Sequence, residues 1–442
     1  MTLPNASIAE PSIVVDRPTA LVDAAISISL RGFPPRQPVT IRAVQHFPSS
    51  TRWQAEATFA ADDDGCVEVS EQAPVEGTYD GVSPMGLFWS AERLPGEAHM
   101  PARDSIMWPR TVDLEATGAE GARATLTIER HVAGSGVTRR PIETEGVVGT
   151  LFLPSGIGPH PAVIVLSGGG GGIDEHWGAI LASHGYAALS LAYFNAPGLP
   201  RGLVNIPLEY FENAIRWTRG QPWLRDHFLA VWGPSRGGEL ALLLGATFPD
   251  INAVIAWVPS GVVFWALGQS EPDDTRPRVA WTFRGKPLPC LQENNPYAGT
   301  APEEPAPGQP VAWAPAYLEH LKDADAVERA AIPVEKIRGP VLLVSGTDDQ
   351  MWPSSTLADI AVRRLEARDF AFPFQHLRYE GAGHTIKVPY GPLTVRVSGL
   401  GVEGFAGRLY SQGGTAKADA EAGVDAWQRQ LSFIKDAVAG RS

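Results

Sequence analysis

Cysteine is scarce in this sequence: only Cys66 and Cys290 are cysteines among 442 residues, and they lie far apart in the chain. Neither belongs to a Cys/His cluster with the spacing of a zinc site, so neither a disulfide framework nor a structural metal is expected. We expect both thiols to be reduced. No other pattern in the sequence calls for a metal or an organic cofactor.

Long apolar runs and basic runs are also missing. No apolar stretch reaches membrane-spanning length, and the first residues have neither the basic start nor the apolar run of a signal peptide. The last three residues, Gly-Arg-Ser, are not the peroxisomal Ser-Lys-Leu tripeptide. These patterns predict a cytoplasmic protein. Because the formal net charge is −13 and no lysine or arginine run forms a basic face, nucleic acid is not expected as a partner.

The composition is that of a globular protein, with 44% hydrophobic and 19% charged residues in a chain longer than one core usually organises. Two domains are therefore expected. Between about Ile13 and Leu94, short alternating runs are cut by Pro-Pro and Asp-Gly turns, a pattern typical of a small antiparallel sandwich without helices. We assign residues 1–123 to an all-β, immunoglobulin-like sandwich. Its segment 85–89 is expected either to wall a substrate pocket or to fill the sandwich core.

The pattern changes near Ala124, and residues 124–442 are assigned to a second domain. Apolar runs of strand length alternate there with segments whose apolar residues have helical spacing. Such runs are typical of parallel strands that are buried on both faces, so a doubly wound α/β sheet is predicted. A proline-rich insertion near 269–315 interrupts this pattern, and we expect it to form a lid or pocket wall.

The clearest motif is Gly233-Pro234-Ser235-Arg236-Gly237, which lies between the strand-like run FLAVW and the helical segment GELALLLGA. A nucleophile at a sharp strand-to-helix turn needs neighbours without side chains two positions before and after it, and Gly233 and Gly237 meet this need. The turn exposes the serine hydroxyl and directs the first N–H groups of the helix at the reacting carbonyl. Ser235 is therefore the predicted nucleophile; the alternative is a glycine-rich turn with an ordinary serine.

A serine nucleophile needs a histidine base and an orienting acid. His384 ends the small-residue turn Gly-Ala-Gly-His, and Asp349 follows the strand-like run VLLV. Asp349 is preferred to Asp348 because the acid tends to be the third residue after the glycine of such loops; the other aspartate would then cap the next helix. The order Ser235, Asp349, His384 is that of the α/β-hydrolase fold, which we therefore predict. The alternative for His384 is a surface-loop histidine.

The oxyanion of such a reaction needs at least two hydrogen-bond donors. One is expected from the Arg236 N–H, and the other from five consecutive glycines at 168–172, which follow the strand-like run PAVIVL. Gly169 and Gly170 are the predicted donors. A phosphate-binding loop is the rival interpretation, and it fails because no Gly-Lys-Ser/Thr follows and the rest of the dinucleotide fingerprint is absent.

At these residues the chain closely resembles the acyl-coenzyme A thioesterase and bile acid-CoA:amino acid N-acyltransferase (BAAT) family, along nearly its whole length, and we expect a bacterial-type member. The N-terminal likeness lies in RGFPPRQPVTIRA and GTYDGVSPMGLFWS. The C-terminal likeness includes GGGGGIDEHW, GPSRGGELALLLGA, IPVEKIRGPVLLVSGTDDQMW and GAGH. The resemblance implies a Ser235, Asp349, His384 triad. It also implies cleavage of a small-molecule acyl thioester, carried by CoA or a pantetheine group, through an acyl-serine intermediate.

The resemblance leaves the acyl acceptor open, because water accepts the acyl group in the thioesterases and an amino acid amine in the transferases. Those transferases usually carry cysteine at the nucleophile position, so the serine favours hydrolysis. Transfer to an amine, alcohol or carrier, a carboxylesterase, and a catalytically silent binding protein are the alternatives. The insertion is longer than expected in the animal thioesterases. Candidates for CoA-phosphate contacts are Arg201, Arg284, Lys286 and the Arg236 side chain.

Overall fold

The computed structural model describes residues 10–96, 105–144, 146–268, 276, 278–291, 309–399 and 409–440. The chain forms two compact units. The first comprises Met1–Ala133 with Lys387–Val395, and the second comprises Gly134–Ile386 with Arg396–Ser442. This division differs from the boundary predicted after residue 123, because β10 (Arg123–His131) pairs along its length with β9 (Arg110–Gly118) and so belongs to the first unit.

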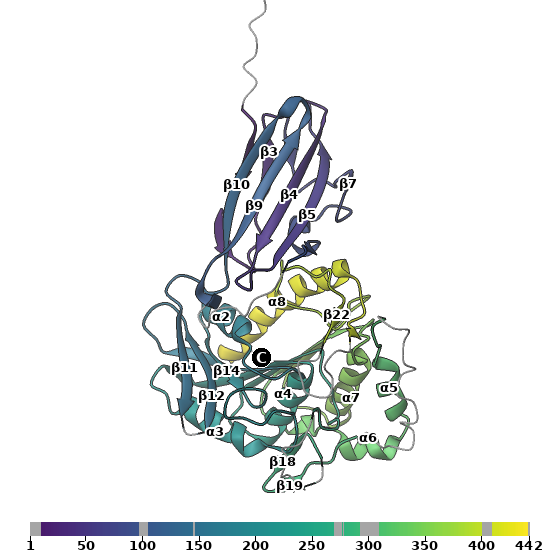
Figure 1. Ribbon diagram of the computed structural model, residues 1–442. Helices are drawn as coiled ribbons and strands as arrows, with labels where there is room; N and C mark the ends of the chain where they lie inside the picture. The colour runs from purple at the N-terminus through teal and green to yellow at the C-terminus, as the bar shows by residue number, and fades with distance from the viewer. Residues whose placement is uncertain are drawn as a thin grey trace, which may run out of the picture. The chain divides into compact units, whose positions relative to one another are not determined.

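The described residues of the first unit form two β-sheets. The smaller has the order β1 (Ser12–Val15), β3 (Ile28–Arg31), β6 (Val67–Glu68). The larger has the order β2 (Thr19–Leu21), β10, β9, β4 (Pro38–His46), β5 (Arg52–Ala60), β7 (Glu76–Gly77), with β8 (Glu92–Arg93) also paired to β5. Figure 1 shows β10, β9, β4 and β5 side by side. Every second residue of β4 is buried, as the sequence alternation predicts for a strand with one face on a core.

A short helix, α1 (Gly86–Trp89), departs from the expectation that this unit has no helix. All four of its residues are buried, and the Gln45 side-chain amide donates to the Phe88 carbonyl at 2.9 Å. Residues 387–395 join the same unit, because the Leu393 N–H donates to the Trp89 carbonyl at 2.9 Å. The segment 85–89 thus packs inside the first unit.

The second unit is built on an eight-stranded sheet. Its order is β11 (Thr138–Thr144), β12 (Val147–Leu153), β14 (Ala187–Ala192), β13 (His160–Leu166), β16 (Leu224–Pro234), β17 (Ala253–Trp257), β20 (Val341–Gly346), β21 (Phe374–Tyr379). The strands from β14 to β21 are parallel, while β11 and β12 are antiparallel. The predicted α/β-hydrolase-like architecture is thereby confirmed. Parallel strands end at one edge of the sheet, so the loops after them share that edge.

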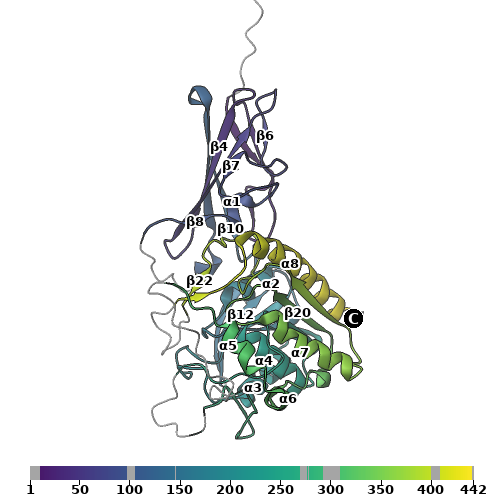
Figure 2. The ribbon, with the colours of Figure 1, turned by 90° about the vertical axis from the view of Figure 1, so that its right-hand side faces the viewer.

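Helices cover both faces of this sheet (Figures 1 and 2). On one face lie α2 (Glu175–Ser183) and α8 (Ala416–Val438), and on the other lie α3 (Leu208–Arg219), α4 (Arg236–Thr247) and α7 (Ser354–Ala367). The Trp177 ring of α2 lies 4.2 Å from that of Trp232 on β16 and 5.5 Å from that of Trp427 on α8. These indoles form the core beneath the two helices, since Trp232 and Trp427 are fully buried.

The chain between β17 and β20 contains the predicted insertion, of which residues 269–275, 277 and 292–308 lie outside the described residues. Its described parts include β18 (Trp281–Phe283) and β19 (Lys286–Pro287), which form a small sheet with β15 (Ile206–Pro207). The other elements in the described part of the chain are α5 (Ala314–His320), α6 (Ala324–Ala330), β22 (Val397–Ser398), β23 (Tyr410–Ser411) and the 3₁₀ turns Ser105–Met107, Ala119–Gly121 and Val334–Lys336. No helix among the described residues combines the length and apolarity needed to cross a bilayer.

Candidate active site

Ser235 occupies a strained turn between β16 and α4. Its backbone has φ 56° and ψ −122°, a conformation that side-chain-bearing residues rarely adopt. A Cβ on Gly233 would lie 2.3 Å from the Gly237 carbonyl oxygen, and one on Gly237 would lie 2.3 Å from the Ser167 carbonyl oxygen. Both glycines are therefore required by close backbone approach, which is the reason the motif predicts.

The backbone of Ser235 is fixed on both sides. Its N–H donates to the Trp257 carbonyl of β17 at 2.8 Å, and its carbonyl accepts from Gly238 and Glu239 at 2.8 and 3.0 Å. Ser235 itself is half-buried. The turn thus holds a partly accessible hydroxyl in a fixed position. Because Arg236 is the first residue of α4, the helix provides no acceptor for its N–H.

The glycine loop, residues 168–172, follows β13 and lies against this turn. A Cβ on Gly168 would lie 3.6 Å from the Ser235 Cβ. The Gly171 N–H donates to the Gly168 carbonyl at 3.1 Å, which closes a tight turn with Gly169 and Gly170 at its centre. The N–H groups of two central turn residues take no part in the hydrogen bond that closes the turn. Both predicted oxyanion donors therefore lie in a loop next to Ser235.

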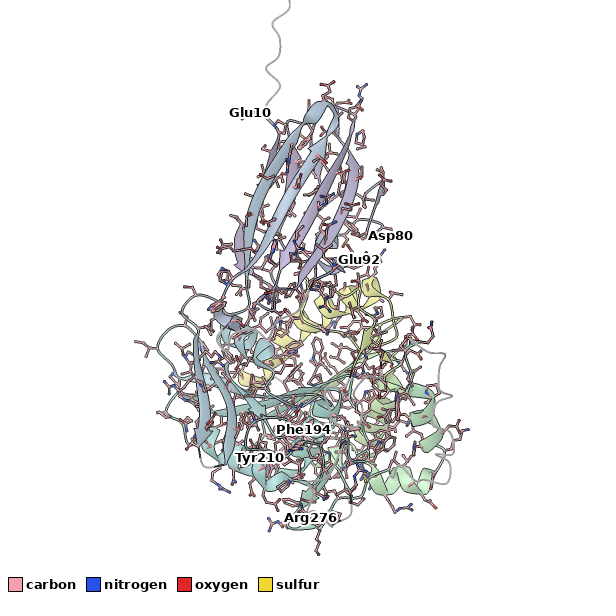
Figure 3. The ribbon with its side chains drawn as sticks, viewed as in Figure 1. Glu10, Asp80, Glu92, Phe194, Tyr210 and Arg276 are labelled. Carbon is pink, nitrogen blue, oxygen red and sulfur yellow. The ribbon has the colours of Figure 1, made fainter. Side chains whose placement is uncertain are left out.

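The segment after β14 supports the glycine loop. The carbonyl of Phe194, labelled in Figure 3, accepts from the Gly172 N–H at 2.9 Å, and the Asn195 side-chain amide donates to the Gly170 carbonyl at 2.8 Å. Gly171 has φ +66°, and a Cβ there would lie 2.7 Å from the Phe194 ring. The loop is thus held in one conformation by its neighbours, as a preorganised donor site requires.

Asp349 and His384 lie in the loops that follow β20 and β21. The His384 Nδ1 is 2.7 Å from the Asp349 Oδ2. The other carboxylate oxygen, Oδ1, accepts from the N–H groups of Met351 at 3.0 Å and Trp352 at 3.2 Å. The Asp349 side chain is fully buried. Because an ionised carboxylate can only accept, Nδ1 carries the proton in this pair, and Nε2 of neutral His384 is the acceptor.

A chain of contacts leads from Ser235 to His384. The Ser235 N–H is bonded to Trp257, and the next carbonyl, that of Val258, accepts from the Trp352 indole at 2.9 Å. The Trp352 ring then meets the His384 ring edge to face, with 6.3 Å between centroids. Ser235 and His384 therefore belong to one packed region at the carboxyl edge of the sheet.

Asp348 has a different role from the one expected. It is exposed, its Oδ2 accepts from the Gly414 N–H at 3.0 Å, and its Oδ1 accepts from the Gln350 side chain at 2.7 Å. The next long helix, α7, is preceded by Pro353 and has no side-chain cap. The expectation that Asp348 caps that helix is wrong, because its carboxylate is turned toward the segment that leads into α8.

The Arg236 side chain is not available to a CoA phosphate, which corrects that expectation. The residue is 2% exposed, its guanidinium pairs with Glu239 at 2.7 Å, and it donates to the carbonyls of Phe264 and Trp265 at 3.2 and 3.0 Å. Glu239 also accepts from the Trp281 indole at 2.8 Å. Burial raises the pKa of Glu239, and the Arg236 charge opposes this shift. The network joins α4 to the chain before and inside the insertion.

The other candidate phosphate contacts lie on exposed positions. Arg284 and Lys286 belong to the hairpin of β18 and β19, and Arg201 precedes β15. The Arg284 guanidinium lies 5.2 Å from the centre of the Phe283 ring, and the Arg284 backbone N–H donates to a carboxylate oxygen of Glu209.

Ser345, His376 and Asp359 form a hydrogen-bonded Ser–His–Asp arrangement in the same unit. The Ser345 Oγ is 2.8 Å from the His376 Nε2, and the His376 Nδ1 is 3.3 Å from the Asp359 Oδ1. Ser345 is 0% exposed, so a substrate cannot reach its hydroxyl. Burial lowers the pKa of His376. The geometry indicates a structural link between β20, β21 and α7.

Replacing Ser345 by alanine is expected to leave the enzymatic rate within a few-fold of wild type. Stability should fall by about 1–3 kcal/mol, because a buried nitrogen of His376 loses its partner. Urea unfolding and a rate assay on the same preparation measure the two quantities. A large rate loss in a stably folded Ser345→Ala variant would contradict the structural assignment.

Several supporting residues were not singled out from the sequence, among them Glu239, Trp281, Arg396 and Asp419. The available signal was a charged residue on an apolar helix face. Glu239 interrupts the apolar run of α4, and Asp419 lies on the buried face of α8, four positions before the buried Gly423. Such a residue needs buried partners, but its sequence position does not identify them.

Two family models match the chain. "BAAT / Acyl-CoA thioester hydrolase C terminal" matches residues 206–440, and "Acyl-CoA thioester hydrolase/BAAT N-terminal region" matches residues 23–144. The two matches fall largely in the second and first units, respectively. They cover the turn at Ser235 together with Asp349 and His384.

Curated relatives match over most of the chain. Acyl-coenzyme A thioesterase 1 of Rattus norvegicus is 31% identical over 427 residues, which are 95% of each chain. The peroxisomal succinyl-coenzyme A thioesterase of Mus musculus is 31% identical over 425 residues, which are 93% of each chain. Among solved structures, a dienelactone hydrolase-like promiscuous phosphotriesterase from metagenomic libraries aligns with 15% identity and a TM-score of 0.41, over 69% of this chain and 99% of its own.

Proposed function

Because the chain belongs to the acyl-CoA thioester hydrolase/BAAT family, we propose that it is a serine hydrolase that cleaves acyl-CoA thioesters through an acyl-serine intermediate. The observation that carries the proposal is the match to acyl-CoA thioesterases along 95% of the chain. A serine in a strained glycine turn and a hydrogen-bonded His–Asp pair in the same region support it.

In the acylation step, the Ser235 Oγ attacks the thioester carbonyl carbon while the His384 Nε2 takes its proton. Asp349 holds Nδ1–H and stabilises the imidazolium that forms. The Arg236 N–H and an N–H of Gly169 or Gly170 bind the oxyanion. When the tetrahedral intermediate collapses, the carbon–sulfur bond breaks and His384 protonates the CoA thiolate.

Deacylation repeats these steps with water as the nucleophile. His384 removes a proton from water, the hydroxide adds to the acyl-serine carbonyl, and the Ser235 oxygen leaves with that proton. The products are a carboxylic acid and the regenerated serine. The Arg201, Arg284 and Lys286 side chains are the proposed contacts for the CoA phosphates, since they are exposed cations.

The proposal is tested with the purified full chain and acyl-CoAs of graded acyl length. We expect release of free CoA, followed with a thiol-detecting dye, and an equal amount of carboxylic acid, measured by mass spectrometry. The panel also includes an acyl-pantetheine and a p-nitrophenyl ester, so that CoA dependence is separated from plain esterase activity. The proposal fails if no acyl-CoA of any length releases thiol.

Acyl transfer is the second candidate, because the N-acyltransferases belong to the same family and the same triad would serve both reactions. Glycine or taurine, added to the same reactions, distinguishes the two. Appearance of an N-acyl amino acid at the expense of the free acid would identify a transferase. A serine at position 235 favours hydrolysis, so we expect the free acid.

Two expectations from the sequence stay part of the proposal. The first unit, with its two β-sheets, is proposed to be an immunoglobulin-like sandwich. The location is proposed to be cytoplasmic, although the family includes relatives named mitochondrial or peroxisomal.

A further inference from the structure

A buried carboxylate lies directly behind the His384 loop. Asp419, in the first turn of α8, is 0% exposed, and its Oδ1 accepts the Gly383 N–H at 2.7 Å. Its Oδ2 accepts from the Arg396 guanidinium at 2.5 Å. A fully buried charge is costly unless it is paired and hydrogen-bonded, and Asp419 has both kinds of partner.

The His384 loop needs such support because the chain leaves the second unit immediately after it. Residues from Lys387 to Val395 belong to the first unit, and the chain returns at Arg396. Asp419 therefore binds the chain on both sides of residues 387–395, at Gly383 before this segment and at Arg396 after it. Because its carboxylate holds both Gly383 and Arg396, Asp419 limits the positions that the adjacent His384 backbone can occupy.

The same network also supports the acid loop. The His384 N–H donates to the Gln412 carbonyl at 2.8 Å, and the next residue, Gly413, forms a β-bridge with Asp349. The Arg396 guanidinium donates to the Gly413 carbonyl. Residues 412–413 thus lie between the two loops, and Arg396 ties them to Asp419.

We infer that Asp419, acting with Arg396, is a positioning residue that sets the alignment of His384 with Asp349 and Ser235. This inference rests on the proposed function. The carboxylate acts through the backbone of Gly383, next to the base, and does not itself meet the substrate. A displacement of about 1 Å at a catalytic group can cost on the order of a hundredfold in rate.

The test compares Asp419→Asn, Asp419→Ala and a matched control, Asp436→Asn, with wild type. Asparagine keeps the side-chain volume and one oxygen for the Gly383 N–H, but it loses the charge facing Arg396, whereas alanine removes both. Asp436 lies on the same helix, near its C-terminal end, and is exposed. The kinetic constants kcat and KM are measured with the acyl-CoA that wild type cleaves fastest. The labelling rate of Ser235 is measured with a fluorophosphonate.

We expect kcat to fall about tenfold in Asp419→Asn and about a hundredfold in Asp419→Ala, with KM unchanged. The labelling rate should fall in parallel, while Asp436→Asn stays near wild type. Thermal unfolding confirms that each variant is folded at the assay temperature. If Asp419→Ala does not fold, the isosteric Asp419→Asn variant alone tests whether Asp419 positions His384.

A kcat and labelling rate of Asp419→Asn equal to those of the control would overturn the inference, as would a rise in KM alone. Failure of the proposed function has a different signature, since wild type itself would then release no CoA from acyl-CoA. Fluorophosphonate labelling still reports the alignment of Ser235 and His384 in that case, so the two failures are distinguishable.

Discussion

Ser235→Ala is expected to lower kcat/KM for acyl-CoA hydrolysis by on the order of 10⁴-fold or more, because no nucleophile is left to form the acyl-enzyme. KM should change little, since the hydroxyl contributes to chemistry rather than to binding of the acyl-CoA. The strained backbone at this position, φ 56°, is tolerated by alanine no worse than by serine, so the variant should fold. Thiol release measures the rate, and circular dichroism checks folding.

The matched control is Ser345→Ala, because Ser345 has its own hydrogen-bonded histidine but is fully buried. Fluorophosphonate labelling adds a second readout. Wild type and Ser345→Ala should be labelled, whereas Ser235→Ala should not. An unchanged rate in Ser235→Ala would end the nucleophile assignment, and absence of labelling in wild type would restore the interpretation as a silent binding protein.

Asp349→Asn is expected to lower kcat by on the order of 10⁴-fold. Asp349 Oδ1 already accepts from two backbone N–H groups, so the asparagine oxygen will keep that position and its NH₂ will face His384 Nδ1. An NH₂ group can only donate, which forces the proton of neutral His384 onto Nε2. The imidazole then cannot accept the Ser235 proton, although its position is little changed.

The control for this prediction is Asp348→Asn, which alters the adjacent carboxylate. Asp348 is exposed and accepts from Gly414 and Gln350, contacts that do not involve His384. Its rate should stay within a few-fold of wild type. Rate measurements on the two variants therefore distinguish the two candidate acids, and a severe loss in Asp348→Asn with a mild one in Asp349→Asn would reverse the assignment.

Much of the second unit could be predicted because its signals are local. The segment LEYFENAIRWTR, whose apolar residues have helical spacing, is α3, Leu208–Arg219, and the apolar run VVGTLFLP is β12, Val147–Leu153. Apolar spacing along neighbouring residues determines such elements. The glycine requirement at Gly233 and Gly237 was equally readable, because a sharp turn restricts the residues beside it. The catalytic roles of Ser235, Asp349 and His384 remain predictions until the variants are measured.

The boundary between the units was not readable in the same way. The strand β10 looks like the start of the second domain, since another strand follows it, but its hydrogen bonds go to β9. The return of residues 387–395 to the first unit gave no sequence signal either. A run of apolar residues indicates a strand. The sheet to which that strand belongs depends on the partner strand to which it is hydrogen-bonded.

The amino-acid sequence by itself determined the alternation of strands and helices, the glycine turn around Ser235, the glycine loop beside it, and the family. The tertiary structure alone decided that the Arg236 guanidinium is buried against Glu239 and that Asp419 binds the Gly383 N–H beside His384. The preference for Asp349 over Asp348 came from the sequence, and the structure places Asp349 against His384. The physical reason is the range of the interactions. Periodicity and turn chemistry depend on adjacent residues, whereas a buried charge is satisfied by groups that the fold brings from distant parts of the chain.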